Sequence, residues 1–118
     1  MRILWLVFAL LLVATTPAWA ANPTTFTWTA SVVDATHSAP TYYTVKCGTV
    51  TGGPYTMIAS TASAVTTLPI ASVPGVTAPG TYYCVITASN LAGESGNSAQ
   101  VAFSLATVPS VPSGLQVQ

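Results

Sequence analysis

Charged side chains are almost missing from this chain of 118 residues. They make up 3 % of the sequence and comprise Arg2, Asp34, Lys46 and Glu94, whereas roughly a quarter of the residues in ordinary globular proteins are charged. A surface that neutralises a nucleic-acid backbone needs a cluster of cations, so binding through counterion release is excluded. Sites that depend on several ionisable groups are excluded for the same reason.

Residues that carry catalysis or hold metals are also scarce. The one histidine, His37, shares a predicted loop with Asp34 and Ser38, whereas the members of a catalytic triad come from separately positioned elements. Asp34 and Glu94 show no general-acid environment for glycoside chemistry. One imidazole and two thiolates, with no close-spaced pair, do not match a zinc site. The sequence therefore predicts a non-enzymatic protein with no cofactor and no metal.

The N-terminus has the parts of a secretory signal peptide. Arg2 supplies a cationic start, residues 3–14 form an unbroken apolar run, and Ala18-Trp19-Ala20 is a small-x-small cleavage site. The run spans about 18 Å as a helix, short of the roughly 30 Å of a bilayer core, and no second run of transmembrane length follows. We expect cleavage after residue 20, and a protein that is secreted and is extracellular or periplasmic.

The predicted export bears on the oxidation state of the two cysteines. Cys47 and Cys84 are the only pair in the chain, and compartments beyond the membrane favour oxidation. A bridge between them would constrain the unfolded chain strongly, because it would close a long loop. Two buried free thiols are the alternative.

After residue 20, turn residues separate segments in which polar and apolar side chains alternate, and no helical stripe is present. This pattern predicts an antiparallel β-sandwich. The expected strands cover residues 24–31, 41–49, 55–60, 63–70, 81–89 and 98–105. Residues 71–80 are a crossing rich in proline and glycine, and 90–96 form a hairpin loop in which Gly93 and Gly96 are available for positive φ.

Three segments, FTWTAS, YYTVKCGTVTGGPYT and GTYYCVITASNLAGESGNSAQV, resemble strands of bacterial fibronectin type III domains, an immunoglobulin-like fold. The resemblance implies a domain over residues 21–105, with Trp28 as a buried core residue. It also implies that the Tyr82 hydroxyl is tied back to the preceding crossing, with Tyr83 as the competing candidate. Since the family places the strands of Cys47 and Cys84 side by side, it supports the disulfide between them.

The chain departs from the family at its first strand. Only seven residues separate the expected cleavage point from Trp28, so this strand is missing from its usual N-terminal place. Residues 106–118 form a Pro-rich tail that resembles a linker and the first strand of a following domain, with Leu115 and Val117 as its core-facing pair. Three interpretations remain open: a frayed tail, a tail docked on its own domain or on another partner, and a strand donated to the next molecule.

Surface contact is the remaining role. The loops at 32–40 and 90–96 lie at one end of the family's fold, and Tyr42 and Tyr83 are expected to face outward, where tyrosines suit protein or carbohydrate contact. Cross-strand packing of these aromatics is the alternative. We expect a secreted adhesion or interaction module of the cell surface or matrix whose partner is a protein or a polysaccharide. The alternatives are a structural subunit of a head-to-tail donor-strand assembly and an accessory carbohydrate-binding domain.

Overall fold

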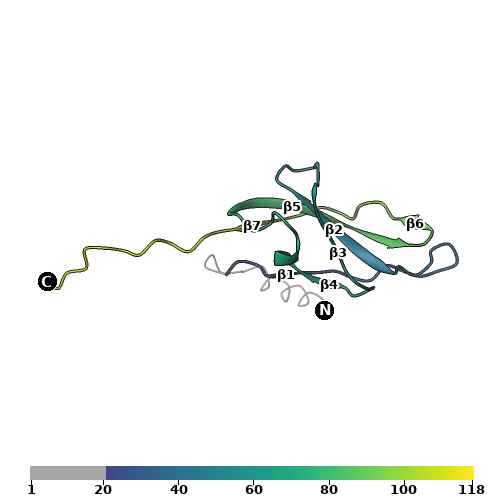
Figure 1. The fold of residues 1–118 in the computed structure, drawn as a ribbon, viewed down its shortest axis with the longest axis horizontal. Coiled ribbons are helices and arrows are strands. Elements are labelled where there is room, and N and C mark those ends of the chain that lie inside the picture. The colour runs from purple at the N-terminus through teal and green to yellow at the C-terminus, as the bar shows by residue number, and fades with distance from the viewer. Residues whose placement is uncertain (1–20) are drawn as a thin grey trace, which may run out of the picture.

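A computed structural model describes residues 21–118, and the predicted signal peptide lies outside these residues. The described chain is all-β with antiparallel pairing, as the sequence predicts (Figure 1). Its strands are β1 (Thr25–Thr27), β2 (Tyr42–Gly48), β3 (Met57–Ser60), β4 (Thr67–Pro69), β5 (Gly80–Asn90), β6 (Gly93–Glu94) and β7 (Val101–Leu105). A single 3-10 turn, η1 (Ile70–Ser72), stands at the start of the crossing, where no helix is expected from the sequence.

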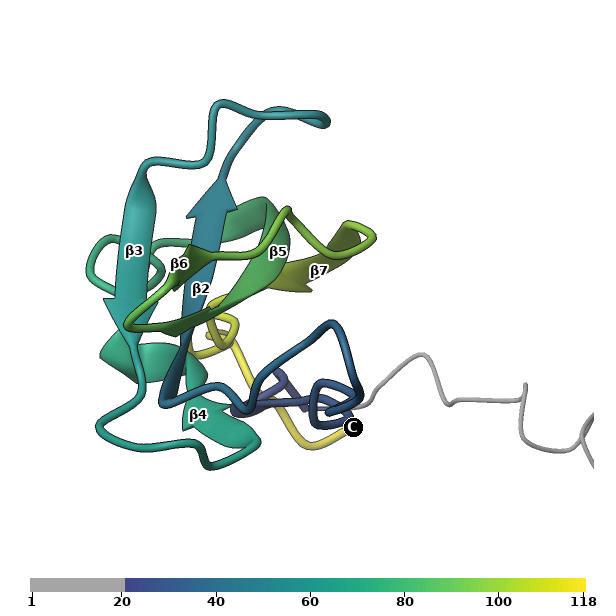
Figure 2. The ribbon, with the colours of Figure 1, turned by 90° about the vertical axis from the view of Figure 1, so that its right-hand side faces the viewer.

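The strands form two sheets. The larger has the order β3-β2-β5-β6, with β7 also paired to β5, and the smaller is the pair β1-β4. Figure 2 shows β3, β2, β5 and β7 in succession across the larger sheet, with β4 on a separate layer. Residues far apart in sequence therefore come together on one central strand, β5, which is paired along most of its length.

Alternation along the central strands creates the core between the two layers. In β2 the inward side chains are Tyr43, Val45 and Cys47, all of them buried. The smaller sheet contributes Phe26, whose ring packs edge-on against Phe103 of β7 with the centroids 5.6 Å apart. Burying apolar surface of this kind is the main favourable term in folding, so these contacts hold the two layers together.

The crossing that follows β4 closes one side of this core. The side chains of Ile70, Val73 and Val76 point into the core and are buried there. The Tyr82 hydroxyl donates a hydrogen bond of 2.6 Å to the carbonyl of Ala78 and so ties the crossing to β5. Of the two candidates in the sequence, Tyr82 is therefore the tyrosine that makes this contact.

The C-terminal segment leaves the sheets at the end of β7. Residues 106–118 have no secondary structure and run away from the sheets in an extended path (Figure 1). The Asn22 side chain makes two hydrogen bonds to the backbone of Ala106, the first residue of this segment. Its amide nitrogen donates to the Ala106 carbonyl at 2.8 Å, and its oxygen accepts from the Ala106 N–H at 3.0 Å. The start of the described chain and the start of the tail therefore lie together.

Candidate binding site at the loop end

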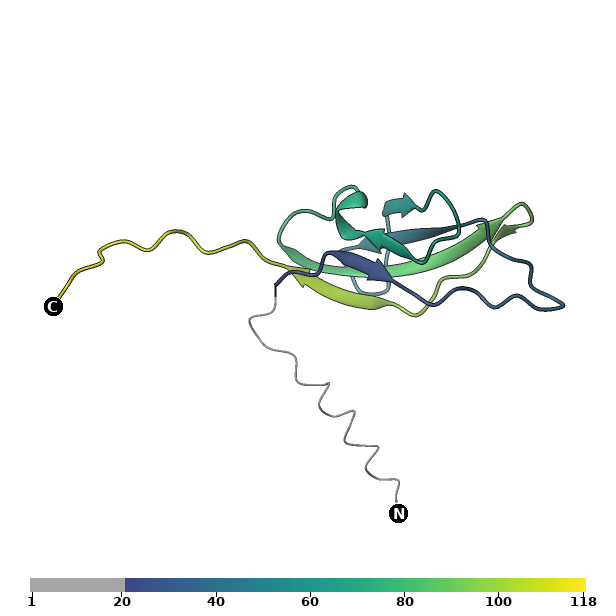
Figure 3. The same cartoon turned by 90° about the horizontal axis from the view of Figure 1, so that it is seen from below.

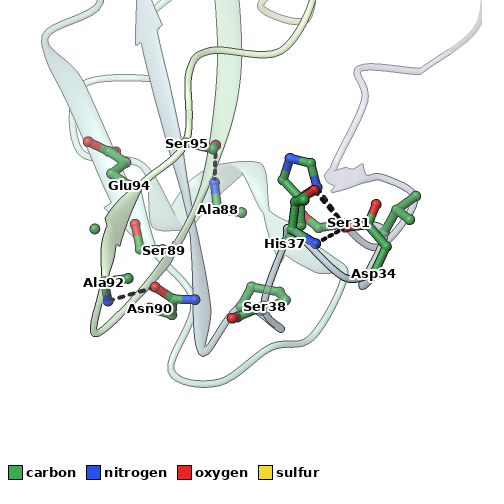
Figure 4. A pocket seen from close by; sticks show the side chains of 14 residues that line it. Ser31, Asp34, His37, Ser38, Ala88, Ser89, Asn90, Ala92, Glu94 and Ser95 are labelled. Atoms are coloured by element: carbon green, nitrogen blue, oxygen red, sulfur yellow. Dashed lines mark hydrogen bonds and ion pairs between the residues drawn. The ribbon is translucent and has the colours of Figure 1, made fainter.

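Two loops lie at the end of the molecule opposite the tail (Figure 1), and residues of both line an open cleft (Figure 4). One loop covers residues 31–40, the other is the β5–β6 hairpin at 88–95, and we call the pair the loop end. The cleft has a volume of about 780 Å³. Its lining is rich in small and hydroxyl side chains: Ser31, Val32, Asp34, Thr36, His37, Ser38, Pro40, Ala88, Ser89, Asn90, Ala92, Gly93, Glu94 and Ser95.

Local hydrogen bonds shape the first loop into a tight turn. The backbones of Asp34 and His37 bond to each other in both directions, at 3.0 and 3.4 Å. The Asp34 carboxylate accepts from the Thr36 N–H at 2.9 Å, a side-chain turn that aspartate forms readily. The same carboxylate lies 2.8 Å from Nδ1 of His37. The loop is therefore held by its own polar side chains.

These contacts act on the acidity of Asp34. Hydrogen bonding to His37, and then to the Thr36 backbone, holds the pKa of this carboxyl below its ordinary value. Both side chains are open to solvent. The Ser38 hydroxyl lies away from the His37 ring (Figure 4), so Asp34, His37 and Ser38 share a loop without the relay geometry of a nucleophilic site.

The second loop is anchored by the acidic residue Glu94. Its carboxylate pairs with Nζ of Lys46 at 2.9 Å and accepts a 2.6 Å hydrogen bond from the Thr87 hydroxyl. The Lys46 hydrogen bond, followed by that of Thr87, lowers the pKa of Glu94. Figure 4 shows Glu94 pointing away from Asp34 and His37. The two carboxylates therefore line one cleft but serve separate structural roles.

Apolar side chains stand on both loops beside this polar cleft. Val32 is 74 % exposed and Leu91 is fully exposed. Leu91 stands at the tip of the hairpin, where Gly93 has a φ of 141° and the Asn90 side chain accepts from the Ala92 N–H at 2.8 Å. Sequence reasoning found both loops but missed these two residues, although the signal was available: each is a large apolar side chain in a loop of polar and small ones.

The two tyrosines predicted for surface contact lie on one face of the sheet but far apart. Tyr42 is opposite Ser89, and Tyr83 is opposite Gly48. Six residues of strand, about 20 Å, separate them. Tyr42 is exposed near the loop end, and Tyr83 is half-buried near the other end. They are therefore two single positions and do not form a paired aromatic platform.

The other predicted residues fall at the core and in the tail. Cys47 and Cys84 are directly opposite in the β2–β5 register and form the disulfide, which confirms that prediction. Trp28 lies just beyond β1, half-buried at the margin of the core, with its ring 5.4 Å from that of Tyr43. Leu115 and Val117 are exposed in the tail.

Comparison of the chain with family models, with curated proteins and with solved structures found no match. Within residues 21–118, no helix is long and apolar enough to cross a membrane. The same residues contain no group of three or more side chains arranged to hold a metal ion.

Proposed function

We propose that the protein is an exported, non-enzymatic interaction module with a fibronectin type III-like β-sandwich, which binds a protein partner through its loop end. The observation that carries this proposal is the cleft between residues 31–40 and 88–95, with apolar side chains exposed on both sides of it. Apolar groups around a polar depression suit a protein surface of complementary shape.

Three features support the fold assignment. The strands that carry the two cysteines are neighbours in one sheet, as the family resemblance requires. The Tyr82 hydroxyl bonds back to the crossing, and the β1–β4 pair faces the larger sheet across a shared core. The oxidised cysteine pair suits the compartments outside the cytoplasm, and it supports the exported location that the N-terminal sequence predicts.

The composition of the cleft favours a protein partner over a carbohydrate. Sugar rings commonly stack on aromatic side chains, because an aromatic face is apolar and rigid. The lining residues of the cleft include no phenylalanine, tyrosine or tryptophan. Six residues of strand separate Tyr42 from Tyr83, so the two side chains cannot stack on the same sugar ring. An accessory carbohydrate-binding role is therefore the weaker candidate.

The proposal is tested by binding of the fluorescently labelled chain, residues 21–118, to the surface of the cells that produce it. Val32→Asp and Leu91→Asp each place a charge at the loop end, and Val50→Asp places the same charge on an exposed valine beyond the far end of β2. We expect each loop-end variant to weaken binding at least about tenfold, as for a central interface residue, and the control to bind like the unmodified chain.

Two results would contradict the proposal. Equal binding by the loop-end variants and the Val50→Asp control would show that the loop end is not the contact surface. Retention of the chain on insoluble cellulose, chitin, xylan or peptidoglycan, reduced by Tyr42→Ala, would show a carbohydrate-binding role instead. Absence of retention on all four polysaccharides, together with cell binding through the loop end, is the expected outcome.

A further inference from the structure

The smaller sheet has an open edge along β1. Trp28 donates its backbone N–H to Thr66, and Ile70 donates to the carbonyl of Thr24. Since alternate residues of an antiparallel strand bond to the same neighbour, the backbone groups of Thr25 and Thr27 point to the opposite side. Within residues 21–118 no strand pairs with that side. Such an edge is a template for another strand.

A groove runs beside this edge, between residues 26–31 and 95–101; it is apolar in the half near Phe26 and Val101 and rich in hydroxyl side chains in the half toward the loop end. It consists of two cavities of about 210 and 380 Å³ that share Trp28, Ile86 and Ser98 among their lining residues. Phe26 lines one side, Val45 and Cys84 the floor, and Val101 the far side. Neither cavity is lined by a charged side chain, so the groove suits an uncharged strand.

Trp28, which lines both cavities, has one polar atom without a partner. Nε1 of Trp28 is buried and has no hydrogen-bond acceptor among the described residues. Buried polar groups are nearly always paired in folded proteins, and each exception needs an explanation. Because this atom is closed off from solvent, a strand lying in the groove would reach it only if the indole ring turned.

The C-terminal tail has the pattern that the groove needs. Residues 113–118 read Ser-Gly-Leu-Gln-Val-Gln, and the tail from residue 106 onward has no charged side chain. Leu115 and Val117 are 98 % and 97 % exposed. Because Leu115 and Val117 are two residues apart, their side chains point to the same face of an extended strand. Because both side chains are almost fully exposed, covering them would remove a large apolar area from water.

The direction of the strands determines whether the groove suits the tail of its own chain or that of another molecule. β1 and β7 run in opposite directions (Figure 3), and the tail leaves at the end where Asn22 meets Ala106. Turned back into its own groove, the tail would run parallel to β1. A tail that enters from the loop end runs antiparallel to β1, the slightly more stable arrangement, and it comes from another molecule placed head to tail.

We propose that the groove along β1 binds residues 113–118 of a second copy of this chain. Leu115 lies beside Trp28, Val117 beside Phe26, and Gln116 points outward opposite Thr27. Residues 107–112 span about 20 Å when extended, which is a suitable bridge between the two molecules. Because donor and acceptor surfaces differ, the contact repeats and builds an open chain of molecules. The groove adjoins the loop end and shares Ser31, Ala88 and Ser95 with its cleft. The contacts proposed for the tail are with Phe26, Thr27 and Trp28, so the inference does not depend on the partner bound at the loop end.

Sedimentation velocity of residues 21–118 over a concentration series tests the donor strand. We expect species larger than the monomer that increase with concentration. Leu115→Asp places a charge in the apolar groove and should weaken association at least about tenfold. Gln116→Asp adds the same charge one residue away on the outward face, and it should change the association by less than about threefold.

The acceptor is tested by mixing. Thr27→Pro removes an N–H that faces the open edge, a position where proline leaves the existing ladder intact. This variant and Leu115→Asp should each be monomeric alone, because one lacks an acceptor and the other a donor. Mixed in equal amounts they should form one-to-one dimers and nothing larger. Val101→Asp, a charge on an exposed residue of the groove wall, is a second acceptor variant if Thr27→Pro does not give the circular dichroism of the unmodified chain.

Three results would overturn the inference. A chain that stays monomeric at every concentration excludes self-association. Equal association of Leu115→Asp and Gln116→Asp excludes the apolar face of the tail as the donor. A mixture that remains monomeric, while the unmodified chain associates, excludes the groove as the acceptor. All three can occur with cell binding through the loop end intact, so failure here is distinguishable from failure of the proposed function.

Discussion

Removing the disulfide should cost this domain a large share of its stability. The perturbation is the double variant Cys47→Ala/Cys84→Ala. The two residues are 37 apart in sequence, and loss of a cross-link over that distance raises the entropy of the unfolded chain. Its free energy of unfolding should fall by roughly 4 kcal/mol at 25 °C on the chain-entropy account. Domains of ordinary stability unfold with about 5–15 kcal/mol, so the variant should be close to its limit.

Packing adds a smaller loss. Both cysteines are buried among the core residues, and removal of two sulfur atoms takes away apolar contact worth on the order of 1 kcal/mol in all. The unmodified chain refolded under reducing conditions keeps its sulfur atoms and should lose only the cross-link contribution. In a domain of about 100 residues each kcal/mol shifts Tm by about 4–8 °C. With about 5 kcal/mol lost in all, the double variant should therefore melt about 20–40 °C lower.

Urea unfolding of three samples measures both contributions: oxidised chain, reduced chain and double variant, each comprising residues 21–118. The m-value should rise in the two samples without the cross-link, because their unfolded chains expand. Losses below about 1 kcal/mol in both samples would show that the cross-link contributes little to the stability of the fold. A double variant as stable as the reduced chain would refute the packing contribution alone.

Other predictions concern single contacts. Tyr82→Phe removes the hydrogen bond to Ala78 and should lower the free energy of unfolding by about 1 kcal/mol. Tyr83→Phe, on the outer face of the sheet, should change the free energy of unfolding by less than about 0.5 kcal/mol. Equal effects of the two variants in urea unfolding would contradict the role of the Tyr82 hydroxyl. Lys46 and Thr87 lower the pKa of Glu94 below its ordinary 4.5. The ionised Glu94 side chain therefore stabilises the fold fully above pH 4.5, and this stabilisation is lost as the pH falls through the pKa of Glu94 in the folded protein. The stability difference between the unmodified chain and Glu94→Gln should be greatest at pH 6–7 and disappear in strong acid; a difference that grows on acidification would contradict the assignment.

Alternation and turn residues predicted most strands of the fold, because period-two patterning is a local property. The Tyr43, Val45 and Cys47 face of β2 is buried as its pattern indicates. The same pattern places Thr44 and Thr87 outward in water, yet both are buried on that outer face. The cause is tertiary: Ser60 bonds to Thr44 from β3, and Glu94 bonds to Thr87. Alternation within one strand cannot show what a neighbouring strand covers.

Local sequence pattern also could not predict the length of β1 or the geometry of the candidate sites. Residues 24–31 alternate throughout, but β1 is only three residues long, because its partner β4 is itself short. The sequence identified both loops at the loop end and the tail. It could not show that Asp34 and His37 close a turn of their own, nor that a groove lies beside β1, since both depend on how distant segments pack.

Hydrogen exchange at two backbone amides distinguishes a free β1 edge from one occupied by a donated strand. In a lone molecule the N–H groups of Thr25 and Thr27 face an open edge, and their protons should exchange within the dead time of an NMR measurement. At concentrations where the chain associates, both should become protected, and the Leu115→Asp variant should leave them unprotected. Rapid exchange of these two amides in the associated form would contradict strand donation to β1, and so would protection in a dilute sample that sediments as a monomer.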